Sequence, residues 1–147
     1  MYLDSCILVK LLVVEPDSGF FMRALVGRTL STSELAYTEV FSALLARERS
    51  GSLSAADRRL AWKEFGSRLE TGEIRMEPLN SVVLRKAVQL LERCQPEVPL
   101  RTLDAIHLAT ADLCQDFPLV TTDVRMRDAG QLMSLDLFPP GAGAPAN

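Results

Sequence analysis

The sequence is poor in the residues that build cross-linked or zinc-ribbon proteins. Of its 147 residues three are cysteines, Cys6, Cys94 and Cys114, and no two of them form a CxxC pair. This odd number without a pair excludes a disulfide framework and a zinc ribbon, and it is typical of free thiols in a reducing cytosol. Histidine is scarcer still, with His107 as the single example.

No apolar run in the sequence is long enough to span a membrane. The run at 7–14 is interrupted by Lys10 and falls well short of the roughly 20 residues that a spanning helix needs. It follows an acid, Asp4, rather than the basic leader of a secretory signal. We therefore expect a cytoplasmic protein with no membrane partner.

Several catalytic signatures are also missing. The chain has no glycine-rich phosphate loop, no GxSxG turn and no cysteine spaced to pair with a histidine. Nucleotide-binding and serine-hydrolase functions are therefore without support.

An excess of positive charge is absent too. The 16 lysines and arginines are outnumbered by 19 aspartates and glutamates, which gives a formal net charge of −3 and a pI near 5.2. A protein that holds nucleic acid over a broad basic surface usually has a pI above about 9. A local stripe of positive charge is still possible, because six basic residues fall within residues 47–68. This stretch is interpreted either as a solvated helix face or as a surface that follows an RNA backbone. The six residues are Arg47, Arg49, Arg58, Arg59, Lys63 and Arg68.

The length and the hydrophobic pattern predict one α/β domain. Short strands are expected at 1–3, 28–32, 73–77, 119–122 and 135–138, with helices between them. Three of these helices are predicted to be capped at their N-termini by Ser5, Ser54 and Thr102. This alternation predicts a mainly parallel central sheet flanked by helices in three layers. We expect a single domain over 1–138, followed by a flexible Pro/Gly/Ala tail at 139–147.

Two acids follow predicted strands directly. Asp4 comes after the first strand and Asp123 after the fourth. Ligands bind parallel sheets in the crevice beyond the carboxyl ends of the strands, so both acids are candidates for a site there. Each taken alone also fits an ordinary helix cap or turn residue.

Two further acids lie on helix faces that point inward. The helical neighbours of Glu39 are apolar or small, and an unpaired carboxylate is costly in such surroundings. Its alternative is a salt bridge to an arginine of another helix. Asp104 lies in the first turn of its helix, where the helix dipole alone favours an acid, but it shares a face with His107 and Leu108.

If these four carboxylates converge, their repulsion calls for a cation. Mg²⁺ or Mn²⁺ suits such oxygen ligands and supports phosphodiester hydrolysis. His107 is a poorer magnesium ligand and is interpreted as a structural histidine with its hydrogen bonds satisfied. Supporting residues are predicted around the acids, as donors that orient carboxylates or water, or as a contact to substrate phosphate. They are Ser5, Thr121, Thr122 and Arg101, the last of which alternatively pairs with one of the acids.

Four stretches in this order resemble the PIN-domain family, most of all the VapC-type toxins of bacterial toxin–antitoxin pairs. They are Tyr-Leu-Asp-Ser at 2–5, Leu-Ala-Tyr-Thr-Glu-Val at 35–40, Leu-Asp-Ala-Ile-His-Leu-Ala at 103–109, and Val-Thr-Thr-Asp at 120–123. The resemblance covers residues 1–138. It implies a metal-dependent endoribonuclease, with Asp4, Glu39, Asp104 and Asp123 as the acidic metal-binding cluster and 5′-phosphate and 3′-hydroxyl products. It also implies a cognate antitoxin and a homodimer.

Two other functions stay open at this stage. The chain is alternatively a non-catalytic PIN-like interaction module whose acidic pocket receives a basic side chain of a partner. A phospho-accepting regulator is less well supported, because Ser5 rather than a second acid follows Asp4 and no lysine occurs after Lys86. For the nuclease, bound metal would offset the acids, so RNA binding is expected to weaken without metal and with rising salt.

Overall fold

A parallel sheet forms the centre of the molecule. The computed structural model describes residues 1–141, and residues 142–147 of the expected tail lie outside that range. Within 1–141 the sheet has five strands in the order β3-β2-β1-β4-β5, and each neighbouring pair runs parallel. The strands are β1 (Tyr2–Leu3), β2 (Leu30–Ser33), β3 (Ile74–Glu77), β4 (Leu119–Val120) and β5 (Leu137–Phe138). The predicted α/β fold with a mainly parallel sheet is confirmed.

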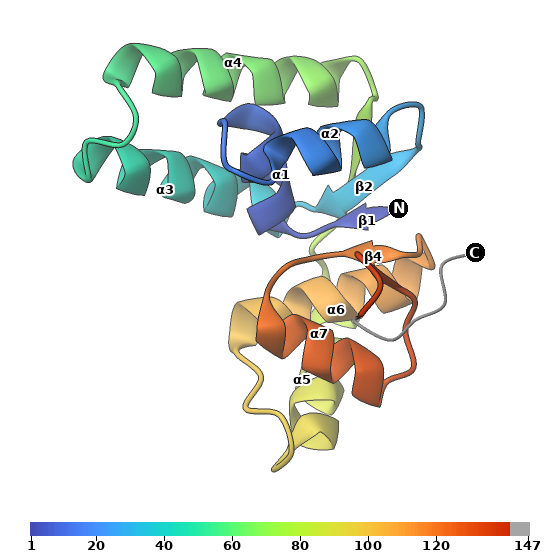
Figure 1. Ribbon diagram of the computed structural model, residues 1–147. Helices are drawn as coiled ribbons and strands as arrows, with labels where there is room; N and C mark the ends of the chain where they lie inside the picture. Colours follow the sequence, from blue (N-terminus) through green and yellow to red (C-terminus); the bar gives the residue numbers. More distant parts are fainter. Residues whose placement is uncertain (142–147) are drawn as a thin grey trace.

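Helices cover both faces of this sheet (Figure 1). On one side lie α1 (Ser5–Leu12), α2 (Ser18–Leu25), α3 (Leu35–Arg49) and α4 (Ala55–Glu70). On the other side lie α5 (Ser81–Cys94), α6 (Thr102–Cys114) and α7 (Val124–Leu132). The three predicted layers are therefore present.

The two cores follow from the alternation of side chains along the short strands. Tyr2 and Leu119 pack into a cluster with residues of α5, α6 and α7, whereas Leu3 and Val120 pack into a second cluster with residues of α1 to α4. Successive strand residues point to opposite faces, so even two-residue strands contribute to both cores. This burial on both faces fixes the register of β1 and β4.

Of the caps predicted at Ser54, Ser5 and Thr102, the first is confirmed and the other two are wrong. Ser54 accepts a hydrogen bond from the Asp57 N–H at 3.1 Å and donates to its carboxylate at 2.6 Å, a reciprocal cap. The helices predicted to be capped by Ser5 and Thr102 begin one residue earlier, with Asp4 and Arg101 as caps. Ser5 instead turns its hydroxyl toward α3. Between Met1 and Gly141, no helix is both long enough and apolar enough to cross a membrane.

Candidate active site

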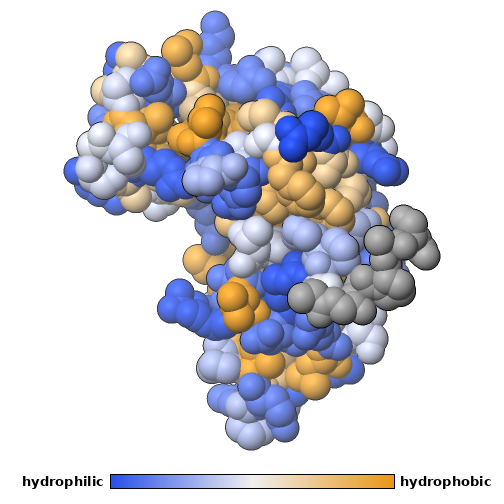
Figure 2. Space-filling view, in the orientation of Figure 1, coloured by the Kyte–Doolittle hydropathy of each residue, from blue (hydrophilic) through white to orange (hydrophobic). Residues whose placement is uncertain are grey.

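The sheet topology places the candidate site at the carboxyl ends of β1 and β4. From β1 the chain proceeds to β2 and β3 on one side, and later to β4 and β5 on the other. The crevice of an open parallel sheet opens where the strand order reverses in this way. Figure 1 shows that β1 leads into α1 and β4 into α7 at this end, and the outline of the surface narrows there below α3 and α4 (Figure 2).

Asp4 is buried at the end of β1, with 6% of its surface exposed. Its Oδ2 accepts hydrogen bonds from Thr121 Oγ1 at 2.8 Å and from Cys6 Sγ at 2.9 Å. Although Asp4 is the N-cap of α1, its side chain makes no capping hydrogen bond to the described helix. The carboxylate is thus held toward β4 rather than toward its own helix.

Cys6 is a neighbour of Asp4 that the sequence did not single out. Burial, and then the charge of Asp4 and its hydrogen bond, raise the pKa of the Cys6 thiol to about 12. The group therefore stays a thiol at neutral pH and donates to Asp4. Its spacing of two residues from Asp4 was the available signal. Exposed Thr122 lies beside it, with Oγ1 3.6 Å from Cys6 Sγ.

Asp123 plays the capping role that was its alternative interpretation, but it also lies near the other acids. Its Oδ1 accepts from the Met126 N–H at 3.0 Å and caps α7. Its own N–H donates to Thr121 Oγ1 at 3.0 Å. Thr121 therefore connects Asp123 to Asp4.

Asp104 carries the site's unsatisfied oxygen. Its Oδ2 is buried and has no hydrogen-bond partner among residues 1–141. Burial, and then the charges of Asp123 and Asp4, raise the pKa of Asp104, while the backbone and guanidinium of Arg101 act in the opposite direction. Asp104 thus has a buried oxygen without a donor and lies near two other carboxylates, so a bound cation would stabilise the folded protein at this place.

Glu39 is held by a histidine and not by an arginine. His107 Nε2 lies 2.6 Å from Glu39 Oε2, and Ser5 Oγ donates to the same oxygen. Burial alone would raise the pKa of Glu39, but the hydrogen bond and charge of His107 and the hydrogen bond of Ser5 lower it below its usual value. The arginine pair considered from the sequence is thus replaced by His107.

His107 is fully satisfied, as its structural interpretation requires. It is 2% exposed, and its Nδ1 lies 2.8 Å from the hydroxyl of Tyr2. The contact of His107 with Glu39 was not predicted. The available signal was its position three residues after Asp104, which places His107 and Asp104 on one face of α6.

The structure therefore places Asp104 under the electrostatic influence of Asp123 and Asp4. Glu39 is held by Ser5, the residue that follows Asp4 in the chain. In the part of the chain described, no three His, Cys, Asp or Glu side chains form a ready-made metal-binding group. The oxygen donors nevertheless fit a hard divalent cation, which takes one or two carboxylates and keeps several waters. Arg101, exposed at the start of α6, lies at the edge of this group.

The six bases of α3 and α4 are less available than their number suggests. Arg47 pairs with Glu15, Arg58 with Glu48, and Arg68 with both Glu64 and Glu73. These ion pairs leave less unpaired positive charge on the two helices, which favours their interpretation as a solvated face.

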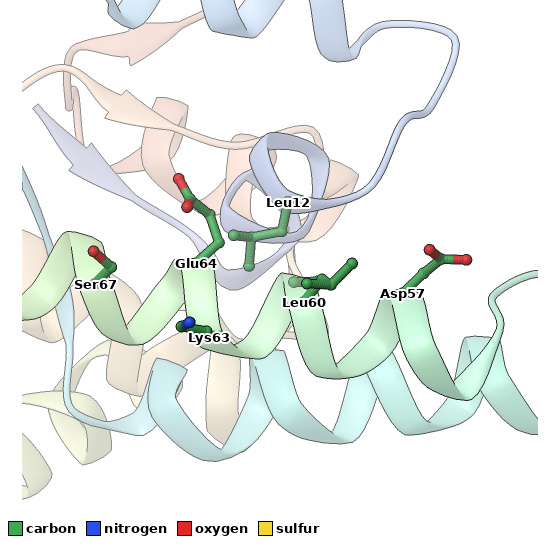
Figure 3. Close-up of a pocket in the computed structure, with 7 residues that line it drawn as sticks. Leu12, Asp57, Leu60, Lys63, Glu64 and Ser67 are labelled. Atoms are coloured by element: carbon green, nitrogen blue, oxygen red, sulfur yellow. The ribbon is translucent and has the colours of Figure 1, made fainter.

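A separate pocket of about 530 Å³ does not belong to the acidic site. Figure 3 shows Asp57, Leu60, Glu64 and Ser67 spaced along α4, with Leu12 of α1 opposite. The polar groups are spread along one helix and do not converge on a point, so this pocket lacks the arrangement that catalysis requires.

The sequence pattern of the PIN domain matches residues 1–132. The chain belongs to the PIN-domain family. Its curated relatives include Ribonuclease VapC46 of Mycobacterium tuberculosis, 37% identical over 145 residues, which cover 95% of this chain and 97% of the relative. Ribonuclease VapC35 of the same organism is 34% identical over 148 residues, covering 96% and 97%.

A solved structure shares the PIN-domain fold. A toxin-antitoxin complex from Klebsiella pneumoniae contains a chain that matches with a TM-score of 0.57 at 19% identity, covering 84% of this chain and 87% of that one. At this identity the likeness supports the fold of the PIN domain described above.

Proposed function

We propose that this PIN-domain protein is a metal-dependent endoribonuclease and the toxin of a toxin–antitoxin pair. The observation that carries the proposal is the buried, unpartnered Oδ2 of Asp104 beside the charges of Asp123 and Asp4. Its two M. tuberculosis relatives are ribonucleases by name and align over nearly the whole chain, which supports the same activity here.

Asp4, Asp104, Asp123 and Glu39 would hold Mg²⁺ or Mn²⁺ directly or through water. When bound, the cation would activate water and offset the charge that builds on the phosphodiester. The other groups prepare these ligands. Thr121 and Cys6 both donate to Oδ2 of Asp4 and so orient the carboxylate. Asp123 uses Oδ1 to cap α7, and its Oδ2 would be the oxygen that contacts the cation.

The substrate side of the site is formed by exposed groups at its edge. Arg101, the N-cap of α6, would contact an RNA phosphate, and Thr122 would orient the substrate or a water beside Asp4. Hydrolysis would leave 5′-phosphate and 3′-hydroxyl ends. A basic side chain of the antitoxin would fit the same acids and block them. The homodimer and the cytoplasmic location stay predictions.

Purified full-length protein, a structured RNA and added Mn²⁺ provide the test. We expect Asp4→Asn and Asp104→Asn each to lower the cleavage rate on the order of 100-fold or more, because a bound metal contributes several kcal/mol to such reactions. Asp128→Asn is the matched control, since Asp128 is an exposed acid of α7. Wild-type rates in Asp104→Asn, with contaminating nuclease excluded, would show that the acids around Asp104 do not carry the reaction. Absence of metal-dependent cleavage by the wild type would favour the non-catalytic binding module.

A further inference from the structure

A row of hydrogen-bonded side chains crosses from β1 through α6 to α3. Tyr2 is fully buried and its hydroxyl lies 2.8 Å from His107 Nδ1. On the other side of the ring, Nε2 lies 2.6 Å from Glu39 Oε2, and Ser5 Oγ lies 3.2 Å from Nε2. Both nitrogens of the imidazole are thereby hydrogen-bonded, Nδ1 with Tyr2 of β1 and Nε2 with Glu39 of α3.

The chemistry of the partners assigns the protons in this row. An ionised carboxylate only accepts, so Nε2 carries the hydrogen that it donates to Glu39. In this tautomer Nδ1 carries no hydrogen and only accepts, so the hydroxyl of Tyr2 donates to it. The tyrosine ring also meets the imidazole edge-on, at 5.9 Å between centroids and 71° between planes, which fixes the plane of the ring.

Glu39 needs such a support because its side chain is long and sits at the boundary of the core, 22% exposed. A free glutamate side chain samples many rotamers, and holding it in one costs conformational entropy. Two donors on one oxygen, from the first residue of α1 and from α6, restrict the side chain before any ligand binds.

We propose that His107 is a positioning residue for Glu39, and that Tyr2 holds the imidazole of His107 in the orientation in which it does this. The proposal rests on the proposed function, because it assigns the support of one acid of that site. It changes the interpretation of His107 from a histidine that merely fills the core to one whose Nε2–H is required for activity. Neighbouring donors of this kind commonly change metal affinity or activity 10- to 100-fold when removed.

Two amide substitutions separate positioning from packing. In His107→Gln the terminal amide nitrogen reaches about as far as Nε2 and can still donate to Glu39. In His107→Asn the shorter amide lies near Nδ1, where it can accept from Tyr2 but cannot reach Glu39. Both remove the ring from the same buried place, so both are expected to lower the melting temperature.

We expect His107→Asn to lower the RNA cleavage rate about 10- to 100-fold and His107→Gln to restore most of the loss. The buried Leu90 of α5 serves as a stability control, because Leu90→Ala destabilises the core but removes no hydrogen bond of the row. The proposal would be overturned if His107→Asn and His107→Gln lost activity equally, and if that loss followed the fall in melting temperature as it does in Leu90→Ala. Full activity in His107→Asn would overturn it as well.

A spectroscopic readout tests the same inference without catalysis. His107 is the single histidine of the chain, so the imidazole ¹⁵N signals of the untagged protein need no assignment. We expect the Nε2–H tautomer in the wild type and a mixture of tautomers in Glu39→Gln, whose side-chain amide can donate as well as accept. A predominant Nδ1–H tautomer in the wild type contradicts the proposal. If the NMR result holds but the wild-type protein does not cleave RNA, the proposed function fails and the arrangement of the row stands.

Discussion

The hydroxyl of Thr121 donates to Oδ2 of Asp4 at 2.8 Å and so joins the end of β4 to the end of β1. The same hydroxyl accepts from the N–H of Asp123 at 3.0 Å. One side chain thus sets the positions of two acids that are 119 residues apart in the sequence (123 − 4). The short β4 is what makes this possible, because it ends at Val120 and leaves Thr121 free to turn inward.

Replacing this hydroxyl tests its role. Thr121→Val keeps the shape but removes the donor to Asp4, and we expect cleavage to fall about 10- to 100-fold. Thr32→Val is the matched control, since Thr32 also donates a buried hydrogen bond at 2.8 Å, but to the carbonyl of Leu3. Each variant should lose about 1–3 kcal/mol of stability. Equal activity in the two variants would show that Thr121 contributes packing and nothing more.

Asp104 should destabilise the metal-free fold. Its pKa is raised, first by burial and then by Asp123 and Asp4, so above that pKa the charged carboxylate is less favourable in the folded than in the unfolded chain. We expect Asp104→Asn to raise the melting temperature at pH 7 in EDTA, and the difference from wild type to narrow as pH falls and Asp104 takes up its proton. Mn²⁺ should raise the melting temperature of the wild type but not of this variant. A lower melting temperature of Asp104→Asn in EDTA would contradict this account.

Cys6 should react slowly with alkylating reagents. Only the thiolate is nucleophilic, and a rise in pKa from 9.0 to about 12 lowers its fraction about 1000-fold at pH 8. Mass spectrometry after treatment with iodoacetamide should therefore show slow labelling of Cys6 in the folded protein and rapid labelling in urea. Asp4→Asn should accelerate the reaction in the folded protein, because it removes the neighbouring charge. Labelling of folded wild-type Cys6 at the unfolded rate would show that the thiol is not held against Asp4.

Arg101 should bind substrate phosphate from the edge of the site. In an Asp104→Asn background, which separates binding from cleavage, Arg101→Ala is expected to weaken RNA binding and to make the slope of log K against log salt shallower by about 1. Arg28 is the control, because it is an exposed arginine before β2, at the opposite end of the strands. Fluorescence anisotropy over a salt series measures both effects. An equal change in Arg28→Ala would assign the contribution to overall charge.

Local patterns were sufficient for most of the fold. The alternation of short strands and helices predicted the parallel sheet, and Ser54 as a predicted cap gave the start of α4. Asp4 was identified because a strand end places it in the crevice, and its alternative interpretation as a helix cap is also met, since it is the N-cap of α1. Its carboxylate is drawn away from the helix by Thr121, which no local rule for caps can anticipate.

The contacts within the site were harder to predict because they join distant residues. Glu39 and His107 are 68 residues apart, and whether they meet depends on how α3 and α6 sit at the carboxyl end of the sheet. The helical wheel indicated correctly that Glu39 needs a partner but not which partner it finds. The ion pairs that neutralise Arg47, Arg58 and Arg68 likewise depend on tertiary packing.

The central claim is that the acids around Asp104 work through a divalent cation. The most direct measurement is the rate at which EDTA-stripped protein cleaves a defined RNA as Mn²⁺ is added back. The account predicts no cleavage in EDTA, saturable recovery with Mn²⁺ in the wild type, and no recovery in Asp104→Asn. Cleavage by the stripped wild-type protein at the full rate, with contaminating nuclease excluded, would contradict it.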